Sequence, residues 1–280
     1  MSYDFLPIKV DKASIQEIAS LLKTTFPKAK KYTEKFVSWQ YVENPIGHMI
    51  GYNAYFEEEL AAHYALMPIK AIINGKEEKG LLSLNTATHP KHRGKKLFPT
   101  LAAKSFESAS DNGFGFVIGV ANAQSTPGFL KKLDFQFIGM LEAKLGWGDV
   151  LRKQTENVID YQRSWDEKTI KWRLSNPELS YRIKDNRVFA ATDHFGVKVI
   201  LKDFDVTYNI DDKKNSLGFR PIKLWIGIDD TISWKKSFYF DIPLGMRPSP
   251  LNLIFKDLTS SNRKFQFSGV RFSALDFDAY

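Results

Sequence analysis

The stretch TATHPKHRGKKLFPTLA, residues 86–102, carries a cluster of basic side chains around Gly94. A β-branched run precedes the cluster, and a helical pattern begins at Lys96. A strand that leads through a basic, glycine-containing loop into a helix gathers free backbone N–H groups and the positive end of the helix dipole at one spot. Such a spot binds phosphate, so we expect a phosphate group to bind here.

The residues on either side of this loop predict alternating helices and strands. Ser14 to Glu17 reads as a capping box that opens a helix, and this helix ends before Pro27. Asn74-Gly75 suits a tight hairpin, so residues 51–88 are predicted to form an antiparallel meander of three strands. The other predicted elements are a strand at 3–10, helices at 33–42, 96–111 and 125–133, and strands at 116–120 and 135–145.

Composition excludes several classes of protein. The chain has 280 residues and no cysteine, which excludes disulfides, thiolate nucleophiles and cysteine-ligated zinc. It has neither the GxxxxGK[ST] pattern of a P-loop nor a GxGxxG fingerprint, and no metal site is expected. The net charge of +8 favours an anionic partner. No stretch approaches the ~20 apolar residues of a spanning helix, and no leader pattern opens the chain, so we expect a cytoplasmic protein without membrane contact.

The order of these elements resembles the GNAT acyltransferases, whose corresponding loop holds the pyrophosphate of coenzyme A. Their local pattern is Val-x-Pro-x-x-Arg-Gly-x-Gly-x-Gly/Ala, and residues 88–98 keep its proline at Pro90 and its Arg93-Gly94 pair. Lys96 and Phe98 replace small residues, which is tolerable where their side chains point away from the phosphates. The resemblance implies an acyl-CoA co-substrate held by Ala87, Thr88, Arg93, Gly94, Lys95, Lys96, Leu97 and Phe98, and by Asn122, Ser125 and Phe129.

Four stretches resemble a long, two-domain branch of this family that includes enzymes of surface-polysaccharide biosynthesis. The resemblance covers about residues 3–145 and implies an α+β fold, in which residues 1–147 form a GNAT catalytic domain with a mixed, mostly antiparallel central sheet flanked by helices. Leu130 stands where many members have a tyrosine that protonates the leaving thiolate, so another donor must serve. The four stretches are SWQYVENPIG (38–47), AHYALMP (62–68), LSLNTATHPKHRGKKLF (82–98) and STPGFLKKLDF (125–135).

Residues 148–280 are predicted to form a β-rich C-terminal domain that closes the acceptor cleft. A motif that occurs twice in the chain favours a degenerate second GNAT-like copy, with residues 247–255 as its fifth strand. An unrelated β-rich domain is the alternative. Nothing in this half matches the basic loop, so we do not expect it to bind coenzyme A. The motif consists of Glu34-Lys35, Trp39 and Asn44-Pro45, which recur as Glu167-Lys168, Trp172 and Asn176-Pro177.

For the chemistry, the resemblance implies direct attack of a neutral amine on the thioester, with the oxyanion held by backbone N–H groups of Ala87 and Thr88. His63, on a predicted central strand, is the preferred base, and a packed core histidine is the alternative interpretation. Asn85, on the neighbouring strand, is expected to orient a water molecule. Glu43 is the reserve candidate for the base.

We therefore expect an N-acyltransferase that moves a small acyl group from a coenzyme A thioester to the amine of a dTDP- or UDP-linked amino sugar. Trp39 and Tyr41 are predicted to bind this acceptor, and Trp225 and Trp234 to stack on its base. One alternative is a tandem-GNAT aminoacyl transferase that uses aminoacyl-tRNA; the other is a non-catalytic protein that binds coenzyme A. The intact Arg93-Gly94 pair favours coenzyme A, so nucleic acid is not an expected partner. The acyl group and the oligomeric state stay open.

Overall fold

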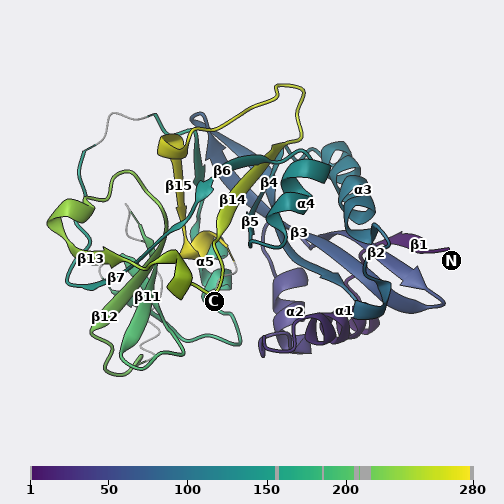
Figure 1. Ribbon diagram of the computed structural model, residues 1–280, viewed down its shortest axis with the longest axis horizontal. Helices are drawn as coiled ribbons and strands as arrows, with labels where there is room; N and C mark the ends of the chain where they lie inside the picture. Colours follow the sequence, from purple (N-terminus) through teal and green to yellow (C-terminus); the bar gives the residue numbers. More distant parts are fainter. Residues whose placement is uncertain (1, 155–157, 185, 205–207, 209–215, 278–280) are drawn as a thin grey trace.

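The computed structural model describes residues 2–154, 158–184, 186–204, 208 and 216–277. It has an α+β fold in which the 15 strands of these residues join in one sheet (Figure 1). The first half follows the predicted order of elements. Its strands are β1 (Asp4–Pro7), β2 (Ile50–Phe56), β3 (Glu59–Ile73), β4 (Lys76–Thr88), β5 (Phe116–Ala121) and β6 (Gln136–Met140).

The expected mixed, mostly antiparallel sheet is present in the first half. Strands β1 to β4 pair antiparallel in chain order, and β4 pairs with β5 in parallel. Helices α1 (Lys12–Thr25) and α2 (Glu34–Tyr41) cover one face of this sheet. Helices α3 (Leu97–Asp111) and α4 (Thr126–Lys132) cover the other face (Figure 1).

Helix α1 begins earlier than the predicted capping box. Asp11 is its N-cap residue, and the Asp11 carboxylate accepts from the backbone N–H of Ser14 at 3.0 Å. An aspartate caps a helix as well as a serine does, and here it leaves Ser14 inside the first turn. The two helices α1 and α2 pack on the sheet through one apolar core that extends into the second half.

Two strands are exchanged between the halves. The predicted strand at 135–145 is divided into β6 and β7 (Glu142–Trp147), and β7 pairs with β12 (Ile222–Ile228) and β13 (Phe238–Asp241) of the second half. In return, β14 (Asn252–Asp257) lies between β5 and β6. The prediction that residues 247–255 are a strand of the second copy was therefore wrong, because β14 completes the first half of the sheet. The domain boundary at residue 147 stays a prediction.

The second half repeats the strand order of the first. Strands β9 (Tyr181–Lys184), β10 (Arg187–Ala191) and β11 (Val197–Asp203) pair antiparallel, β11 pairs with β12 in parallel, and β7 lies between β12 and β13. The order β9-β10-β11-β12-β7-β13 thus corresponds to β2-β3-β4-β5-β14-β6. Strands β8 (Tyr161–Arg163) and β15 (Val270–Ser273) pair with each other and join β3 to β12.

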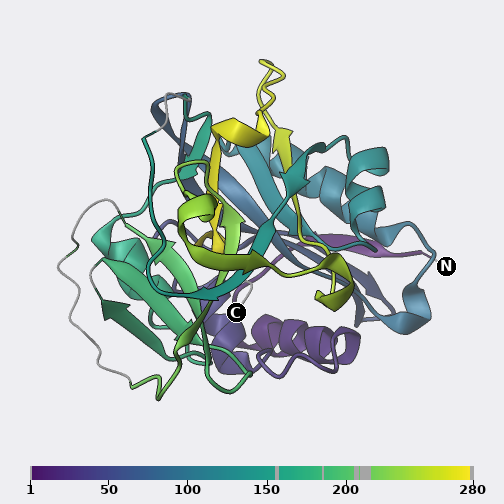
Figure 2. The same ribbon diagram turned by 60° about the vertical axis from the view of Figure 1, so that its left-hand side comes forward.

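Helices α2 and α5 (Glu167–Arg173) meet at a pair of tryptophans. The indole rings of Trp39 and Trp172 stack with centroids 5.0 Å apart. Each indole N–H donates to the backbone carbonyl oxygen of the other tryptophan, at 3.0 and 3.1 Å. This reciprocal contact joins the two repeated sequence motifs, and Figure 2 shows the purple helices α1 and α2 below the sheet. In the described part of the chain, no helix is long and apolar enough to cross a membrane.

Candidate functional site

The parallel strands β4 and β5 diverge in the middle of the sheet. They pair at Leu81–Val117, Leu82–Ile118 and Ser83–Gly119, and within the described residues this pairing stops there. Strand β4 then continues to Thr88 and β5 to Ala121, while β14 occupies the other edge of β5. Divergent parallel strands leave backbone groups free at their carboxyl ends, which is where ligands bind in α/β sheets.

A β-bulge lies on β4 just beyond this divergence. His63 faces Ala87 and Ala65 faces Leu84, so two residues of β4 stand opposite Tyr64 of β3. Asn85 accommodates the extra residue with φ of +50°. A bulge bends its strand and redirects its backbone groups, and bulges are frequent beside active sites. The bulge therefore places the backbone of 85–88 at the open edge of β4.

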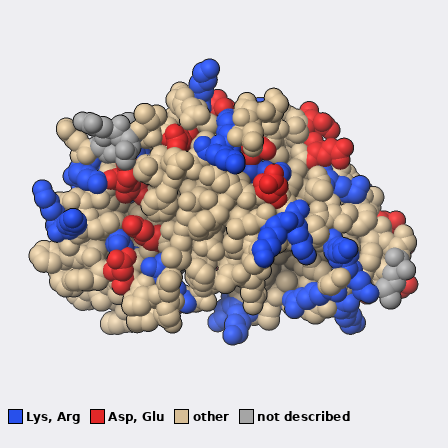
Figure 3. Space-filling view, turned by 45° about the horizontal axis from the view of Figure 1, so that its top comes forward, with Lys and Arg blue, Asp and Glu red and all other residues tan. Residues whose placement is uncertain are grey.

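The basic loop 89–96 connects β4 to α3, as predicted. A short 3₁₀ turn, Pro90–His92, is followed by Gly94 with φ of +77° and Lys96 with φ of +58°. Among the described residues, no acceptor is present for the backbone N–H groups of residues 94–98. Lys and Arg side chains gather near the end of the molecule that holds the N-terminus (Figure 3). This loop has the backbone and charge of an anion site.

The side chains of Leu97 and Phe98 point into the protein. Leu97 is buried, and the Phe98 ring packs edge-on against Tyr64 and Phe129, with centroids 5.8 and 5.1 Å away. The bulky residue at position 98 therefore fits because it fills the core between α3 and α4. Only the backbone of Leu97 and Phe98 faces the loop, whereas Arg93, Lys95 and Lys96 are exposed.

The predicted residues after β5 divide into a turn and a core residue. The Asn122 side-chain oxygen accepts from the backbone N–H groups of Gln124 and Ser125, at 3.0 and 2.9 Å. This turn leaves Asn122 exposed at the carboxyl end of β5. Phe129 is buried against Phe98, so it supports the loop through packing.

His63 lies in a buried polar network. Its Nδ1 is 2.6 Å from Asn53 Oδ1, and its Nε2 is 2.7 Å from the Tyr41 hydroxyl. Because Asn53 Oδ1 can only accept, Nδ1 carries the ring proton, and Nε2 accepts from Tyr41. Asn85 Nδ2 donates to the Tyr41 oxygen at 3.2 Å and to Gln40 Oε1 at 2.6 Å. The network thus joins His63, Tyr41 and Asn85 next to the bulge.

Burial sets the protonation state of His63. The ring is fully buried, which lowers its pKa to about 3, because a charged imidazolium loses its hydration there. His63 is therefore neutral at physiological pH. Glu43, the reserve candidate, is exposed just after α2.

The two predicted acceptor residues are both buried. Tyr41 contacts His63 and Asn85, so it belongs to the network beside the bulge. Trp39 is stacked on Trp172, and its indole N–H is already bonded to the second half. Trp225 and Trp234 pack edge-on against each other at 4.9 Å, and Trp225 is buried. Of the four predicted aromatic contacts, Tyr41 is the one that the structure brings to the network.

A groove of about 770 Å³ begins beside the turn after β5. It follows β7 and β12, and most of its lining is apolar, including exposed rings of Trp147 and Phe240. At one end Ser249 lines the groove, and its hydroxyl accepts from the Ala123 backbone N–H at 3.1 Å. Arg247, Asp193 and Asp241 are the charged side chains of the lining. The groove therefore adjoins the carboxyl end of β5.

Sequence reasoning missed several polar residues of this region. Gln40 and Asn53 complete the His63 network, and the Tyr64 hydroxyl is 2.9 Å from the Ser83 hydroxyl where β4 and β5 diverge. The SWQY and AHYAL stretches contain two of these residues, but only the pairing of β2, β3 and β4 brings them together. In the residues that the structure describes, no group of three or more acidic, histidine or cysteine side chains is arranged to hold a metal ion.

Comparisons with known proteins agree with this geometry. The first similar solved structure is a conserved protein of unknown function from Enterococcus faecalis V583, named a probable N-acyltransferase; it is 10% identical, with 92% of this chain and 73% of that chain covered and a TM-score of 0.61. The second is a GCN5-related N-acetyltransferase from Anabaena variabilis ATCC 29413, at 12% identity, 91% and 73% coverage and a TM-score of 0.59. At these identities, both similarities show the fold alone.

No curated protein matches the chain significantly. A family model does match: residues 7–138 correspond to the acetyltransferase (GNAT) domain. This segment contains the diverging strands, the bulge and the basic loop. Residues 7–138 therefore match the model of the acetyltransferase (GNAT) domain, and this match supports an N-acyltransferase.

Proposed function

We propose that this protein transfers an acyl group from an acyl-CoA thioester to a primary amine. The observation that carries the proposal is that the β4–β5 divergence lies beside the basic loop 89–96. This loop brings to the start of α3 five backbone N–H groups that have no acceptor in the part of the chain that the structure describes. Such groups suit a pyrophosphate, and the divergence leaves β4 free to bind the rest of an extended donor. Arg93, Lys95 and Lys96 supply the matching charge.

In the proposed reaction, a neutral amine nitrogen forms a bond to the thioester carbonyl carbon, the carbon–sulfur bond then breaks, and the proton that the nitrogen loses passes through water to the leaving thiolate. Of the two predicted residues, Thr88 would hold the oxyanion through its backbone N–H at the open edge of β4, because N–H groups alternate along a strand and the Ala87 N–H, like that of His89, faces β3. His63 is a poor base at this burial, so we assign it the positioning of Tyr41 and Asn85. Leu130 has no hydroxyl, and the Tyr64–Ser83 hydroxyl pair is the proposed hydrogen-bond donor to the leaving sulfur.

For the acceptor, our first candidate is an amine on a nucleotide-linked amino sugar, with a role in surface-polysaccharide biosynthesis. Support comes from the sequence resemblance and from Arg247, a cation that lines the groove beside β5 together with Asp193 and Asp241. The apolar lining of the same groove favours a second candidate, an amine that carries an aliphatic or aromatic body. Both candidates use the same acyl-CoA site.

The test follows thiol release from acetyl-CoA and from hydroxyacyl-CoA with purified protein. The amine panel contains dTDP- and UDP-linked amino sugars, the matching free amino sugars, aryl-alkyl amines and alkyl amines. We expect release with one of these classes, and product mass spectra will show the new amide. Binding of coenzyme A without turnover on any amine would favour the non-catalytic alternative. Acyl transfer that requires aminoacyl-tRNA would favour the tandem aminoacyl transferase.

We predict that Arg93→Glu weakens coenzyme A binding about 5- to 150-fold. The substitution removes a charge-assisted contact and adds repulsion, together worth about 1–3 kcal/mol. Isothermal titration calorimetry of coenzyme A measures the change. The matched control is Arg182→Glu, which makes the same charge change at an exposed position of β9 in the second half. Equal affinities of the Arg93 variant and the wild type would contradict the site.

A further inference from the structure

Strand β13 of the second half carries exposed aromatic side chains. Phe238 and Phe240 of this strand are 62% and 64% exposed, and Trp147 of the adjacent β7 is 54% exposed. The Trp147 ring stacks on Phe238 with centroids 5.7 Å apart and lies 6.2 Å from Phe240. These contacts hold both β13 rings in place, so a partner that covers the rings takes little further rotamer freedom from them. A cluster of ordered, exposed apolar side chains indicates an interaction surface.

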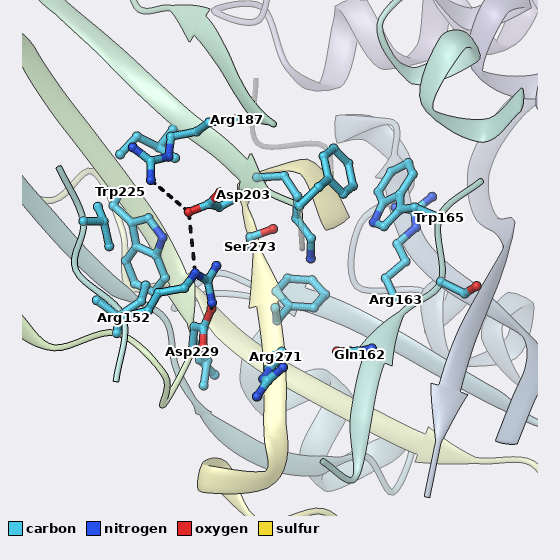
Figure 4. Close-up of a pocket in the computed structure, with 18 of the residues that line it drawn as sticks. Arg152, Gln162, Arg163, Trp165, Arg187, Asp203, Trp225, Asp229, Arg271 and Ser273 are labelled. Atoms are coloured by element: carbon cyan, nitrogen blue, oxygen red, sulfur yellow. Dashed lines mark hydrogen bonds and ion pairs between the residues drawn. The ribbon is translucent and has the colours of Figure 1, made fainter. Parts of the chain in front are cut away.

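The two faces of this half of the sheet differ in chemistry. Side chains alternate between the faces of a strand, so Leu224 of β12 lines the apolar groove, while Trp225 lines a small polar cavity on the opposite face. Charges at that cavity are paired within the chain, since Asp203 lies 3.0 Å from Arg187 and 3.6 Å from Arg152 (Figure 4). The exposed rings of β7 and β13 lie on the face of the groove. The polar face is therefore complete in itself, and the apolar face is the one that is left open.

Strand β13 is also an edge strand, because β7 is its one partner among the described residues. The backbone N–H of Ile242 donates to the Ala143 oxygen of β7 at 2.9 Å, and such bonds alternate along an antiparallel strand. The backbone N–H and C=O groups of Tyr239 and Asp241 therefore point away from β7. In the part of the chain that the structure describes, no backbone partner is present for these outward groups. A row of free backbone groups is a template for another strand.

The corresponding edge strand of the first half, β6, is covered by the chain itself. The Gln136 side-chain amide donates to the Phe265 backbone oxygen at 2.7 Å, and its oxygen accepts from the Phe265 N–H at 3.0 Å. The Phe267 ring lies so close to Gly139 that it leaves no room for a Cβ atom there. The two halves thus share a strand order but differ at this edge, since the rings of β13 are more than half exposed.

Charge favours a second copy of the same strand as the partner of β13. Lys235 and Lys236 precede the strand, and both are exposed. Asp241 ends the strand, and its side chain is 69% exposed although it pairs with Lys144 at 2.6 Å. Two copies of β13 that pair antiparallel place the start of one strand beside the end of the other. Opposite charges then meet at both ends of the paired strands, which favours this pairing over one with a strand of uniform charge.

We propose that this protein forms a homodimer in which β13 pairs antiparallel with β13 of the partner subunit across a two-fold axis. A two-fold axis suits this strand because the same patch of each copy then contacts the other. The sheet continues from one subunit into the next and has no open edge at β13. Figure 1 shows β13 at the end of the molecule opposite the N-terminus, so the dimer does not depend on the proposed acyl-CoA site.

The free backbone groups of β13 determine the register of the paired strands. Tyr239 lies opposite Tyr239 of the partner subunit, because its outward N–H and C=O groups then exchange both hydrogen bonds across the axis. Phe238 lies opposite Phe240 of the partner subunit on the same face of the sheet, with Cβ atoms ~5 Å apart, so that aromatic side chains pair across the two strands. A register centred on Asp241 would instead place two carboxylates opposite each other, which is unfavourable.

The experiment measures the dimer dissociation constant by sedimentation velocity over a range of protein concentrations. We expect a reversible dimer of the wild type. Phe240→Lys should raise the dissociation constant at least about 30-fold, because an edge lysine blocks strand pairing and both copies lose an aromatic contact. The matched control is Phe137→Lys on β6, which makes the same change at an exposed ring of the covered edge strand and should leave the dimer intact. Circular dichroism checks that each variant folds.

Two further measurements keep the proposal testable if Phe240→Lys does not fold. Lys235→Glu combined with Lys236→Glu changes only exposed side chains and should weaken the dimer about tenfold, whereas Lys131→Glu with Lys132→Glu on α4 should not. Hydrogen exchange should show the amides of Tyr239 and Asp241 protected in concentrated protein and exposed on dilution. The proposal is overturned if the wild type is a monomer throughout, if both β13 variants dimerise as tightly as the wild type, or if a dimer leaves these two amides unprotected. A monomer that binds lipid vesicles through the exposed rings would also overturn it.

Discussion

His63 uses both ring nitrogens in the folded protein, one toward Asn53 and the other toward Tyr41. A proton added to Nε2 would remove the acceptor that Tyr41 needs and would place a charge in a fully buried site. The same side chain in the unfolded chain titrates near pH 6.5. The folded protein therefore excludes a proton that the unfolded chain accepts, and this difference couples stability to pH.

We predict that stability falls as pH decreases from about 6.5 toward 3 because of His63. The folded pKa, about 3, lies below the unfolded value, so the unfolded state binds more protons in this window. The contribution is fully present above pH 6.5, and its slope reaches at most about 1.4 kcal/mol per pH unit. Urea denaturation at several pH values measures it. His63→Gln should flatten the slope, whereas the exposed control His48→Gln should not.

Lys96 adopts the left-handed conformation that the GNAT pattern assigns to a glycine. In a residue with a Cβ atom, this conformation destabilises the folded state by about 1–2 kcal/mol. A glycine avoids that strain, but it lowers stability by about 0.4–1 kcal/mol because it raises the conformational entropy of the unfolded chain. We predict that Lys96→Gly stabilises the fold by about 0.5 kcal/mol, measured from the urea midpoint. Lys95→Gly, at a neighbouring position without positive φ, should destabilise it. If Lys96→Gly destabilises the fold, then the charge or the contacts of the Lys96 side chain stabilise it by more than the strain of the left-handed conformation costs.

At the residue scale, the sequence predicted the basic loop better than the polar network. Arg93, Gly94 and the free N–H groups follow from local order along the chain, and the structure has them where the pattern places them. The roles of His63 and Asn85 depend on a bulge and on burial. Both arise from pairing between strands, which no local pattern encodes.

At the scale of elements, the same helix and turn occur once in each half, at α2 and at α5. After each helix an asparagine is buried, and its side-chain oxygen accepts from the backbone N–H two residues later, Ile46 for Asn44 and Glu178 for Asn176. The repeated Asn-Pro pair thus marks two equivalent turns. The turns bring Trp39 and Trp172 into the same position on their helices, where they meet face to face.

We predict an energetic coupling between Trp39 and Trp172. Trp172→Phe removes the indole donor to the buried Trp39 carbonyl oxygen, at a cost of about 1–3 kcal/mol. Trp39→Phe should cost less, because the Trp172 carbonyl oxygen still accepts from the backbone N–H and the hydroxyl of Ser175. The double variant should depart from the sum of the single variants by more than about 0.5 kcal/mol, because the residues are in contact. Trp147→Phe is the control, since Trp147 is 54% exposed. If the effects of the two single substitutions on the free energy of unfolding simply add in the double variant, the predicted coupling is wrong.

The elements themselves were predictable, but two of their partners were not. Helices and the β2–β4 meander have local signals such as Asn74-Gly75. The apolar run 135–145 gives no sign that it divides at Leu141, where one strand ends in the first half and the next enters the second. That division follows from pairing with residues 77 to 119 positions away, which periodicity cannot reveal.

At the scale of the molecule, exchange of β7 and β14 makes the first half incomplete without residue 252 and beyond. Residues 1–147 alone would leave β5 and β6 unpaired with each other and expose β5 as an open edge. Met140 and Asn252 are paired, and the Leu141 backbone N–H donates to the Leu251 oxygen at 2.8 Å. The ends of β6 and β14 are therefore close enough for a tight turn.

We predict that residues 1–141, joined through Asn-Gly to residues 251–265, fold and bind coenzyme A. The two-residue turn would make β6 and β14 a hairpin and restore the strand between β5 and β6. Residues 1–147 alone should fail to bind coenzyme A or aggregate. Circular dichroism and calorimetry compare the two proteins. If both behave alike, β14 is dispensable for the donor site.

The place of β14 also bears on how the protein is made. During synthesis, the first half leaves the ribosome more than 100 residues before the strand that closes its sheet. At roughly 5–20 residues per second, the nascent chain spends several seconds with β5 uncovered. Such long-range closure slows folding and leaves an edge open to other chains. Chaperone binding to nascent chains should therefore peak before residue 252 emerges and fall once β14 has docked.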